Sequence, residues 1–247
     1  MSEARPLALV TGAARRVGAA IAARLHGEGF DLALHYRRSR GGAAALAQRF
    51  NDERAESAWL LEGDLAASDG PARIAEAFLT RASHCDLLVH NASSFYPTAV
   101  GEVDAKVWDD LMGSNLRGPF FLTQALLPAL RVRGGSVVNL IDIHAERPLA
   151  EYPVYSIAKA GLAMLTRSLA RELAPEIRVN GVAPGAILWP EDPEDAFGKQ
   201  QQAILRRIPL GRTGTPEDIA DAVYYLASAP YVTGQILAVD GGRSVVI

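Results

Sequence analysis

Cysteine is nearly absent from this chain of 247 residues, which contains only Cys85. One thiol cannot form a disulfide within the chain, and scarcity of cysteine fits a reducing compartment. The N-terminus lacks a signal peptide, because the apolar run that follows it extends only from Leu7 to Val10. No apolar stretch approaches the ~20 residues that cross a membrane. We therefore expect a cytoplasmic protein that has no membrane partner.

The chain also has no excess of basic residues, no linker between domains and no repeat of fixed period. The chain carries 25 Lys and Arg against 28 Asp and Glu, a net charge of −3, so no overall positive field attracts nucleic acid. Neither a Pro/Gly/Ser-rich stretch nor a run of charges divides it. With 49% hydrophobic residues, the chain can bury one large core. We expect a single domain over residues 1–247.

Apolar runs of strand length alternate with helix-like stretches along the whole chain. Nearly continuous apolar runs are typical of strands buried on both faces, and strands separated by helices predict βαβ units in a parallel sheet. The expected fold is an α/β, doubly wound, Rossmann-like parallel sheet of about seven strands with helices on both faces. The predicted strands are Leu7–Val10, Phe30–Tyr36, Ala58–Leu61, Leu87–His90, Ser136–Ile141, Arg178–Ala183 and Gln235–Val239. The predicted helices include Val17–His26, Gly42–Phe50, Pro71–Ala82 and Trp108–Leu130.

A glycine-containing loop, Thr11–Gly18, joins the first strand to the first helix. Gly12 permits a tight turn and close backbone approach, Gly18 lets the helix pack near the strand, and the helix N-terminus offers free N–H groups to a pyrophosphate. Arg15 and Arg16 put positive charge at this N-terminus, where it opposes the helix dipole. An anionic partner would explain both arginines; the alternative is that they are surface residues at a helix start.

The end of the second strand lacks the acid with which NAD-specific Rossmann folds bind the ribose 2′-hydroxyl. The strand ends in basic residues and a serine, and no acid occurs before Asp52. Guanidinium groups bind phosphate through paired N–H donors, so the pattern favours NADPH over NADH. The alternative is a solvated basic turn. The predicted cofactor ligands here are His35, Tyr36, Arg37, Arg38 and Ser39.

A tyrosine and a lysine four residues apart, Tyr155 and Lys159, fall on one face of a predicted helix that begins near Tyr152. Tyrosine is a weak acid, with a reference pKa of ~10. A neighbouring ammonium group stabilises the phenolate, so we expect Lys159 to lower the pKa of Tyr155 and suit it to proton transfer near neutral pH.

The nucleotide loop, the strands and the Tyr155–Lys159 pair together resemble the short-chain dehydrogenase/reductase family. The resemblance implies that Asn115 supports Lys159 through a water relay and that Lys159 also binds the nicotinamide ribose. It implies that Arg38 and Ser39 are the main 2′-phosphate ligands. His90 stands where that family has an asparagine. Other cofactor contacts implied by the resemblance are Gly12, Arg16, Val17, Gly18, Asp64, Leu65, Asn91, Ala92, Ser93, Pro184 and Gly185.

Most of that family has a serine thirteen residues before the tyrosine, where this chain has Asp142. A serine would donate to a carbonyl oxygen, whereas a carboxyl group can accept from an N–H of an amino-heterocycle or, when protonated, pass a proton through Tyr155. Reduction of a C=N bond requires a proton on nitrogen. The alternatives for Asp142 are a strand-end cap or a salt bridge to Arg147 or Arg171.

The string from Asn91 to Thr98, with the features above, resembles the pteridine reductase branch of the family, and the likeness extends from Val10 to Gly242. It implies that Phe95 stacks on one face of a pterin while the nicotinamide covers the other, and that Ser93 binds the ring or the cofactor. The alternative for Phe95 is an ordinary buried aromatic residue. The predicted substrate-binding residues are Arg16, Ser93, Phe95, Asp142 and Tyr155.

The resulting hypothesis is an NADPH-dependent reductase of dihydropterins, with dihydrofolate and oxidised pterins as further candidate substrates. Two other functions stay open: a carbonyl reductase such as a 3-oxoacyl thioester reductase, and an NADPH-binding regulator without turnover. The segment 187–207 is either a lid or a solvated loop. The resemblance also suggests a homotetramer packed through the Tyr155 helix, where the small residues Ala158, Gly161 and Ala163 would allow close approach, and an Arg243 that approaches a neighbouring subunit's site.

Overall fold

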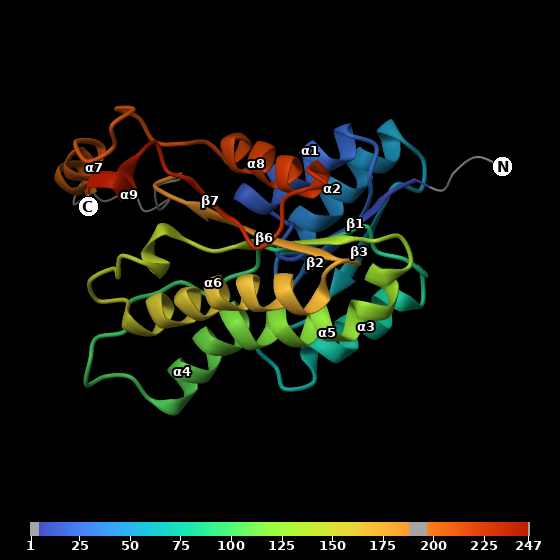
Figure 1. Cartoon of the computed structure of the whole chain (residues 1–247), viewed down its shortest axis with the longest axis horizontal. Coiled ribbons are helices and arrows are strands. Elements are labelled where there is room, and N and C mark those ends of the chain that lie inside the picture. Colours follow the sequence, from blue (N-terminus) through green and yellow to red (C-terminus); the bar gives the residue numbers. More distant parts are fainter. Residues whose placement is uncertain (1–4, 188–196, 247) are drawn as a thin grey trace.

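The computed structural model describes residues 5–187 and 197–246. Its strands form one parallel sheet in the order β3-β2-β1-β4-β5-β6-β7, with helices covering both faces (Figure 1). The predicted α/β fold of seven parallel strands is therefore confirmed. The strands are β1 Leu7–Val10, β2 Asp31–Tyr36, β3 Ala58–Glu62, β4 Leu87–His90, β5 Ser136–Leu140, β6 Arg178–Pro184 and β7 Ile236–Val239.

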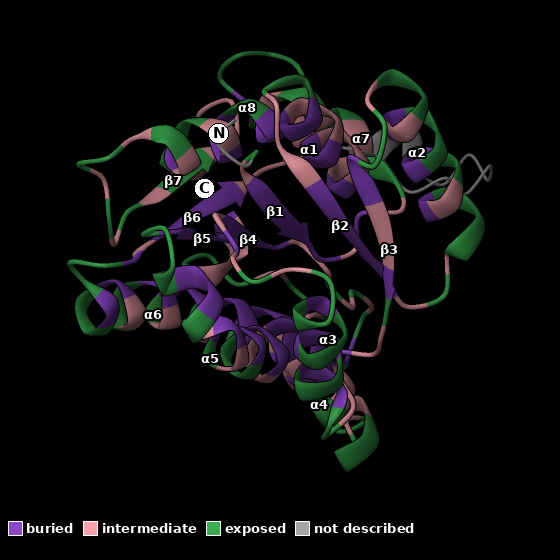
Figure 2. Cartoon of the chain, turned by 90° about the vertical axis from the view of Figure 1, so that its right-hand side faces the viewer, coloured by how far each residue is buried: buried purple, intermediate pink, exposed green. Residues whose placement is uncertain are grey.

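Residues in the central strands alternate between the two faces of the sheet and are buried on both (Figure 2). In β1, Ala8 and Val10 join the core under α1, α2 and α8, whereas Leu7 and Leu9 join the core under α3, α5 and α6. Two covered faces explain the nearly continuous apolar runs of the sequence. The main helices are α1 Arg16–Gly27, α2 Arg40–Glu53, α3 Gly70–Leu79, α4 Ala105–Met112, α5 Gly118–Arg131, α6 Pro153–Leu173, α7 Phe197–Leu205, α8 Pro216–Ser228 and α9 Arg243–Val246.

One predicted helix differs from the structure. The stretch Trp108–Leu130 is divided by a π-helical turn, η1, at Gly113–Arg117, between α4 and α5. Such a turn inserts one extra residue into a helix, and it often lies at a functional site. Periodicity over the whole stretch conceals it, because the apolar pattern continues on both sides.

The order of the strands reverses between β1 and β4, which is where a doubly wound sheet binds its ligands. β1 pairs with β2 on one side and with β4 on the other, and Val10 lies in register with Leu34 and Val89. The carboxyl ends of the three strands therefore meet at one edge. Among the described residues, no helix has both the length and the apolarity needed to cross a membrane.

Candidate active site

The nucleotide loop is held against the end of β4. The amide Nδ2 of Asn91 donates to the carbonyl oxygens of Thr11 at 2.9 Å and of Gly12 at 3.1 Å, and the backbone N–H of Ala92 donates to Thr11 Oγ1 at 3.0 Å. A Cβ atom on Gly18 would lie 2.2 Å from the carbonyl oxygen of Gly12. Close packing therefore requires the two glycines, as their spacing predicts. Asn91 holds the loop through hydrogen bonds to its backbone.

Arg16 has a backbone conformation that favours glycine. Its φ is +53°, in the left-handed region, and its side chain is exposed at the start of α1. A residue other than glycine in this region costs on the order of 1–3 kcal/mol, and such strain collects at functional sites. Arg16 thus places an exposed positive charge beside the nucleotide loop at an energetic cost. Val17, the next residue, packs against the core.

The side chains of His35 and Tyr36 are directed into the protein. Gly12 N–H donates to His35 Nδ1 at 3.2 Å, and His35 Nε2 lies 3.2 Å from the carbonyl oxygen of Gly63. The hydroxyl of Tyr36 donates to Glu62 at 2.8 Å. Both residues were expected to contact the cofactor, but the structure gives their polar atoms partners within the chain.

The arginines that follow β2 have different surroundings. Arg37 lies 3.6 Å from the carboxylate of Asp64 and 3.5 Å from that of Asp110. Arg38 is exposed and has no ion pair with any residue that the structure describes, and Ser39 stands at the N-terminus of α2 with a side chain that does not cap the helix. Arg38 and Ser39 are thus available to a phosphate, whereas Arg37 is already neutralised.

The expected catalytic residues meet at the carboxyl end of β5. Tyr155 donates its hydroxyl proton to Asp142 Oδ2 at 2.8 Å, and Asp142 Oδ1 accepts from the backbone N–H of His144, also at 2.8 Å. Asp142 is therefore a cap of the turn after β5 as well as a partner of the tyrosine. Within the described residues it forms no ion pair with Arg147 or Arg171. Lys159 Nζ donates to the carbonyl oxygen of Leu140 at 2.8 Å.

The electrostatics of this group correct one expectation. Lysine was expected to lower the pKa of Tyr155, but burial first, and then the charge of Asp142 and the hydrogen bond to it, raise that pKa well above its usual value. Burial also lowers the pKa of Lys159 to about 8, and Asp142 opposes this effect. The carboxylate touches the phenol, while the ammonium lies 5.6 Å from the ring centroid. Tyr155 therefore keeps its proton and is a donor.

Asn115 lies in the π-helical turn and organises the loop after β4. Its Nδ2 donates to the carbonyl oxygens of Leu111 and Ser94, each at 3.0 Å, and its Oδ1 accepts from Ser93 Oγ at 2.7 Å. Among the described residues it has no direct hydrogen bond to Lys159. Ser93 is thus tied to Asn115, which joins the π-helical turn to the loop after β4.

Phe95 projects from the loop beside Tyr155. It is 54% exposed, which excludes the alternative of an ordinary buried aromatic residue. Its ring stacks on that of Tyr152 at a centroid distance of 4.5 Å and an interplanar angle of 14°, and it meets Tyr155 edge-on at 4.8 Å. Sequence reasoning missed Tyr152, although its place three residues before Tyr155 puts it near the same face of the helix start.

Two further segments border the site. Gly185 follows β6, where a Cβ atom would lie 2.6 Å from Asp240 Cβ, so Pro184–Gly185 passes close to the turn after β7. Burial lowers the pKa of Arg243, and the nearby charges of Asp142, Arg207 and Asp240 also act on it. The charge of Asp142 in the same chain therefore acts on Arg243. Residues 188–196 of the expected lid lie outside the described residues.

The small residues of α6 pack within the chain. Ala158 and Ala163 are buried, and a Cβ atom on Gly161 would lie 2.6 Å from a methyl group of Leu116. Within the chain, Gly161 approaches Leu116 of η1, and Ala163 packs in a cluster with Ile141 and Ala183. Packing of this helix in a homotetramer stays a prediction. The outward surface of α5 and α6 carries Phe120, Phe121, Ile157 and Met164.

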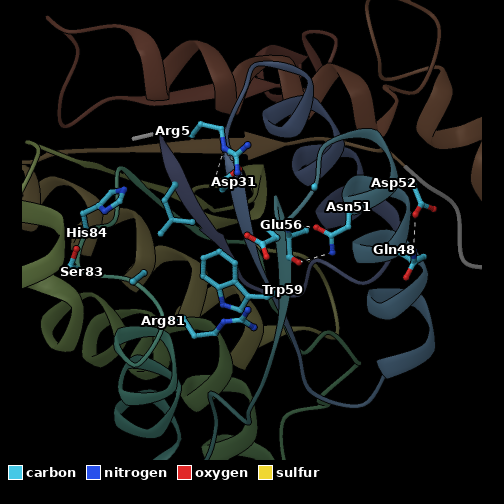
Figure 3. Close-up of a pocket in the computed structure, with 14 residues that line it drawn as sticks. Arg5, Asp31, Gln48, Asn51, Asp52, Glu56, Trp59, Arg81, Ser83 and His84 are labelled. Carbon is cyan, nitrogen blue, oxygen red and sulfur yellow. Dashed lines mark hydrogen bonds and ion pairs between the residues drawn. The ribbon is translucent and has the colours of Figure 1, made fainter. Parts of the chain in front are cut away.

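The remaining predicted cofactor residues lie beside β3. Asp64 Oδ1 accepts from the backbone N–H of Ala66 at 2.9 Å, and Leu65 is buried. A separate pocket of about 770 Å³ opens at the opposite, amino-terminal edge of the sheet, lined by residues that include Trp59, Arg81 and the Arg5–Asp31 pair (Figure 3). None of the expected site residues lines this pocket, so the candidate site is located by the chemistry of its residues.

The chain is similar to known reductases over nearly its whole length. A family model described as enoyl-(acyl carrier protein) reductase matches residues 12–244. Pteridine reductase 1 of Leishmania tarentolae is 38% identical over 285 residues, covering 98% of this chain and 98% of the relative. The 3-oxoacyl-(acyl-carrier-protein) reductase of Staphylococcus aureus (strain Mu50) is 35% identical over 240 residues, covering 95% of this chain and 96% of the relative.

Proposed function

Because this chain belongs to the short-chain dehydrogenase/reductase family, we propose that this oxidoreductase is an NADPH-dependent reductase of pterins. A hydride would add to the carbon of a ring C=N bond and a proton to its nitrogen, which converts a dihydropterin to a tetrahydropterin. Dihydrofolate and oxidised pterins are further candidate substrates. The observation that carries the proposal is the hydrogen bond of 2.8 Å from Tyr155 to Asp142, at a position where most of the family has serine.

Asp142 suits reduction of a C=N bond better than reduction of a carbonyl. A carboxylate has only acceptors, so it binds N–H groups of an amino-heterocycle and offers no donor to a carbonyl oxygen. Tyr155 is protonated at neutral pH, because burial and Asp142 raise its pKa. The phenol can therefore deliver its proton toward the ring nitrogen while Asp142 holds the phenol in place. For a 7,8-dihydropterin, water is an alternative source of the single proton that the ring nitrogen takes.

The residues around the nucleotide loop fit NADPH. The first turn of α1 contains no acid and its N-terminus has no side-chain cap, so its N–H groups are free for a pyrophosphate. Arg38 and Ser39 are available for the 2′-phosphate. When bound, the nicotinamide supplies the hydride, and Lys159 stands where the family's lysine binds the ribose.

The substrate would lie against Phe95. Tyr152 stacks on one face of this ring, and the part of the ring that stays exposed can stack on a pterin. Aromatic stacking contributes roughly 0.5–1.5 kcal/mol beyond the burial of area. The exposed Arg16 can bind the polar edge of the pterin or the cofactor phosphates. The name of the Leishmania relative, pteridine reductase 1, supports this class of substrate.

A second candidate function is reduction of a 3-oxoacyl thioester. It is favoured by the Staphylococcus relative, whose identity of 35% is close to the 38% of the pteridine reductase. Asp142 speaks against it, since a carboxylate cannot supply the second donor, beside Tyr155, that a serine would give to the carbonyl oxygen. A homotetramer is a further part of the proposal, and the exposed apolar side chains on α5 and α6, including Phe120 and Met164, support it.

The test is oxidation of NADPH by the purified protein with dihydropterins, dihydrofolate, oxidised biopterin and an acetoacetyl thioester as separate substrates. We expect turnover with the pterins, and their ranking will identify the preferred side chain. Turnover with the thioester alone would replace the first function by the second. Binding of NADPH without turnover on any substrate would favour the regulator.

A further inference from the structure

His35 connects the nucleotide loop to the loop after β3. Its Nδ1 lies 3.2 Å from the backbone nitrogen of Gly12, and its Nε2 lies 3.2 Å from the carbonyl oxygen of Gly63. The side chain is only 2% exposed. A residue that was expected to touch the cofactor is thus enclosed between two segments that border the cofactor site.

The two partners determine the state of the imidazole. A backbone N–H can only donate, so Nδ1 must be an unprotonated acceptor for Gly12. A backbone carbonyl can only accept, so Nε2 must carry the proton and donate to Gly63. Only the neutral ring with its proton on Nε2 satisfies both contacts. Protonation of Nδ1 would remove the acceptor and place two donors opposite each other.

The surroundings of the ring keep it neutral. Burial lowers the pKa of His35 to about 4, against a hydrogen bond to Gly63 and the charge of Asp64. Asp64, in the loop after β3, is the titratable group whose charge acts on His35. On β4, His90 has a pKa lowered to about 3, mainly by burial and further by the charge of His35.

We propose that His35 is a positioning residue that holds Gly12 in the conformation that binds the dinucleotide. Gly12 has a φ of +64°, and its carbonyl oxygen is held by Asn91 while its N–H is held by His35. Its peptide units are therefore held on both sides before any ligand binds. A loop that is already ordered loses less conformational entropy on binding, so its affinity is higher. This inference rests on the proposed binding of NADPH.

Two substitutions separate the contacts of the ring. His35→Asn puts an amide oxygen near the position of Nδ1 and keeps the acceptor for Gly12, but it loses the contact to Gly63. His35→Gln puts an amide nitrogen near the position of Nε2 and keeps the contact to Gly63, but it loses the acceptor for Gly12. A residue that only fills space or bridges two loops would make the two variants equivalent.

The measurement is the dissociation constant of NADPH at pH 7 for the wild type and both variants, with thermal unfolding to confirm that each is folded. We expect binding to weaken by about tenfold in His35→Gln and by less than about threefold in His35→Asn, as loss of one hydrogen bond predicts. Equal weakening in the two variants, or weaker binding in His35→Asn, would overturn the proposal. A wild type that does not bind NADPH would instead refute the proposed function.

If a variant does not fold, the proposal can be tested on the wild-type protein. In protein labelled with ¹⁵N-histidine, the resonances of His35 should show an unprotonated Nδ1 and a protonated Nε2. The pKa of His35 should also be lower with NADPH bound, because the ligand favours the loop that the neutral ring holds. The opposite tautomer, or the same pKa with and without NADPH, would refute the assignment.

Discussion

Lowering the pH from 7 to 5 should reduce the free energy of unfolding by roughly 4 kcal/mol, because two buried histidines stay neutral in the folded chain. The pKa of His35 is lowered by burial from 6.5 to about 4, and that of His90 from 6.5 to about 3. His90 donates from Nε2 to Thr123 Oγ1, whose own proton goes to the carbonyl oxygen of Pro119. A second proton would break the contact of His35 with Gly12, and on His90 it would put a charge on a ring whose Nδ1 is buried without a partner among the described residues.

The sign and the window follow from these values. At pH 5 the unfolded chain binds a proton at each of the two histidines, whereas the folded chain binds almost none. Stability is therefore complete above pH 6.5 and falls as the pH decreases toward the folded values, by up to about 1.4 kcal/mol per pH unit for each histidine. Between pH 7 and 5 each contributes roughly 2 kcal/mol. His26, whose pKa is lowered mainly by burial, acts in the same direction.

Carboxylates do not produce this effect in the same window. The pKa of Asp218, for example, is lowered below 3.8 by hydrogen bonds from the backbone of Thr215 and from Arg212, so its contribution is lost only at lower pH. A loss of roughly 4 kcal/mol is a large part of the free energy of unfolding of a typical protein, which is about 5–15 kcal/mol. The loss should therefore be easy to measure.

The assay is urea unfolding at pH 7, 6 and 5, followed by circular dichroism and extrapolated to zero denaturant. The matched variant is His90→Gln, whose amide nitrogen can donate to Thr123 and cannot titrate. We expect the variant to lose about 2 kcal/mol less than the wild type over the same range. A wild-type change below about 1 kcal/mol, or the same pH dependence in His90→Gln, would refute the reasoning.

Three further predictions concern activity. Tyr155→Phe should lower kcat by about 10²–10⁴-fold, because it removes the proton donor, while the dissociation constant of NADPH measured by fluorescence titration stays nearly unchanged; loss of both would indicate a structural role. Asp142→Ser should reduce turnover of dihydropterin much more than turnover of an acetoacetyl thioester, and equal losses would contradict the role given to the carboxylate. Arg38→Ala should narrow the preference for NADPH over NADH by about tenfold, as loss of a charge-assisted hydrogen bond predicts. Arg37→Ala should change this ratio less, because Arg37 is paired with Asp64 and Asp110. An unchanged ratio in Arg38→Ala would mean that Arg38 does not bind the 2′-phosphate.

The architecture could be predicted from the sequence because its signals are local. Apolar runs such as Leu87–His90 predict a buried strand wherever they occur, and the structure has this strand with the same bounds. Gly18 marks a close approach, which the 2.2 Å from its virtual Cβ to the oxygen of Gly12 confirms. The spacing between Asp142 and Tyr155 likewise predicted a contact, because Asp142 follows β5 and Tyr155 lies in the first turn of α6.

The sequence by itself determined the elements, the parallel sheet and the edge at which the site lies, since strand and helix periods and the demands of glycine act over a few residues. Only the tertiary structure decided which polar atoms are free. It turned His35 inward while leaving Arg38 exposed, and it placed Asp142 nearer than Lys159 to the Tyr155 hydroxyl, which reverses the expected direction of the pKa shift. Proton affinities and hydrogen-bond partners depend on distances of a few ångströms between strands. These distances cannot be inferred from the spacing of residues along the chain.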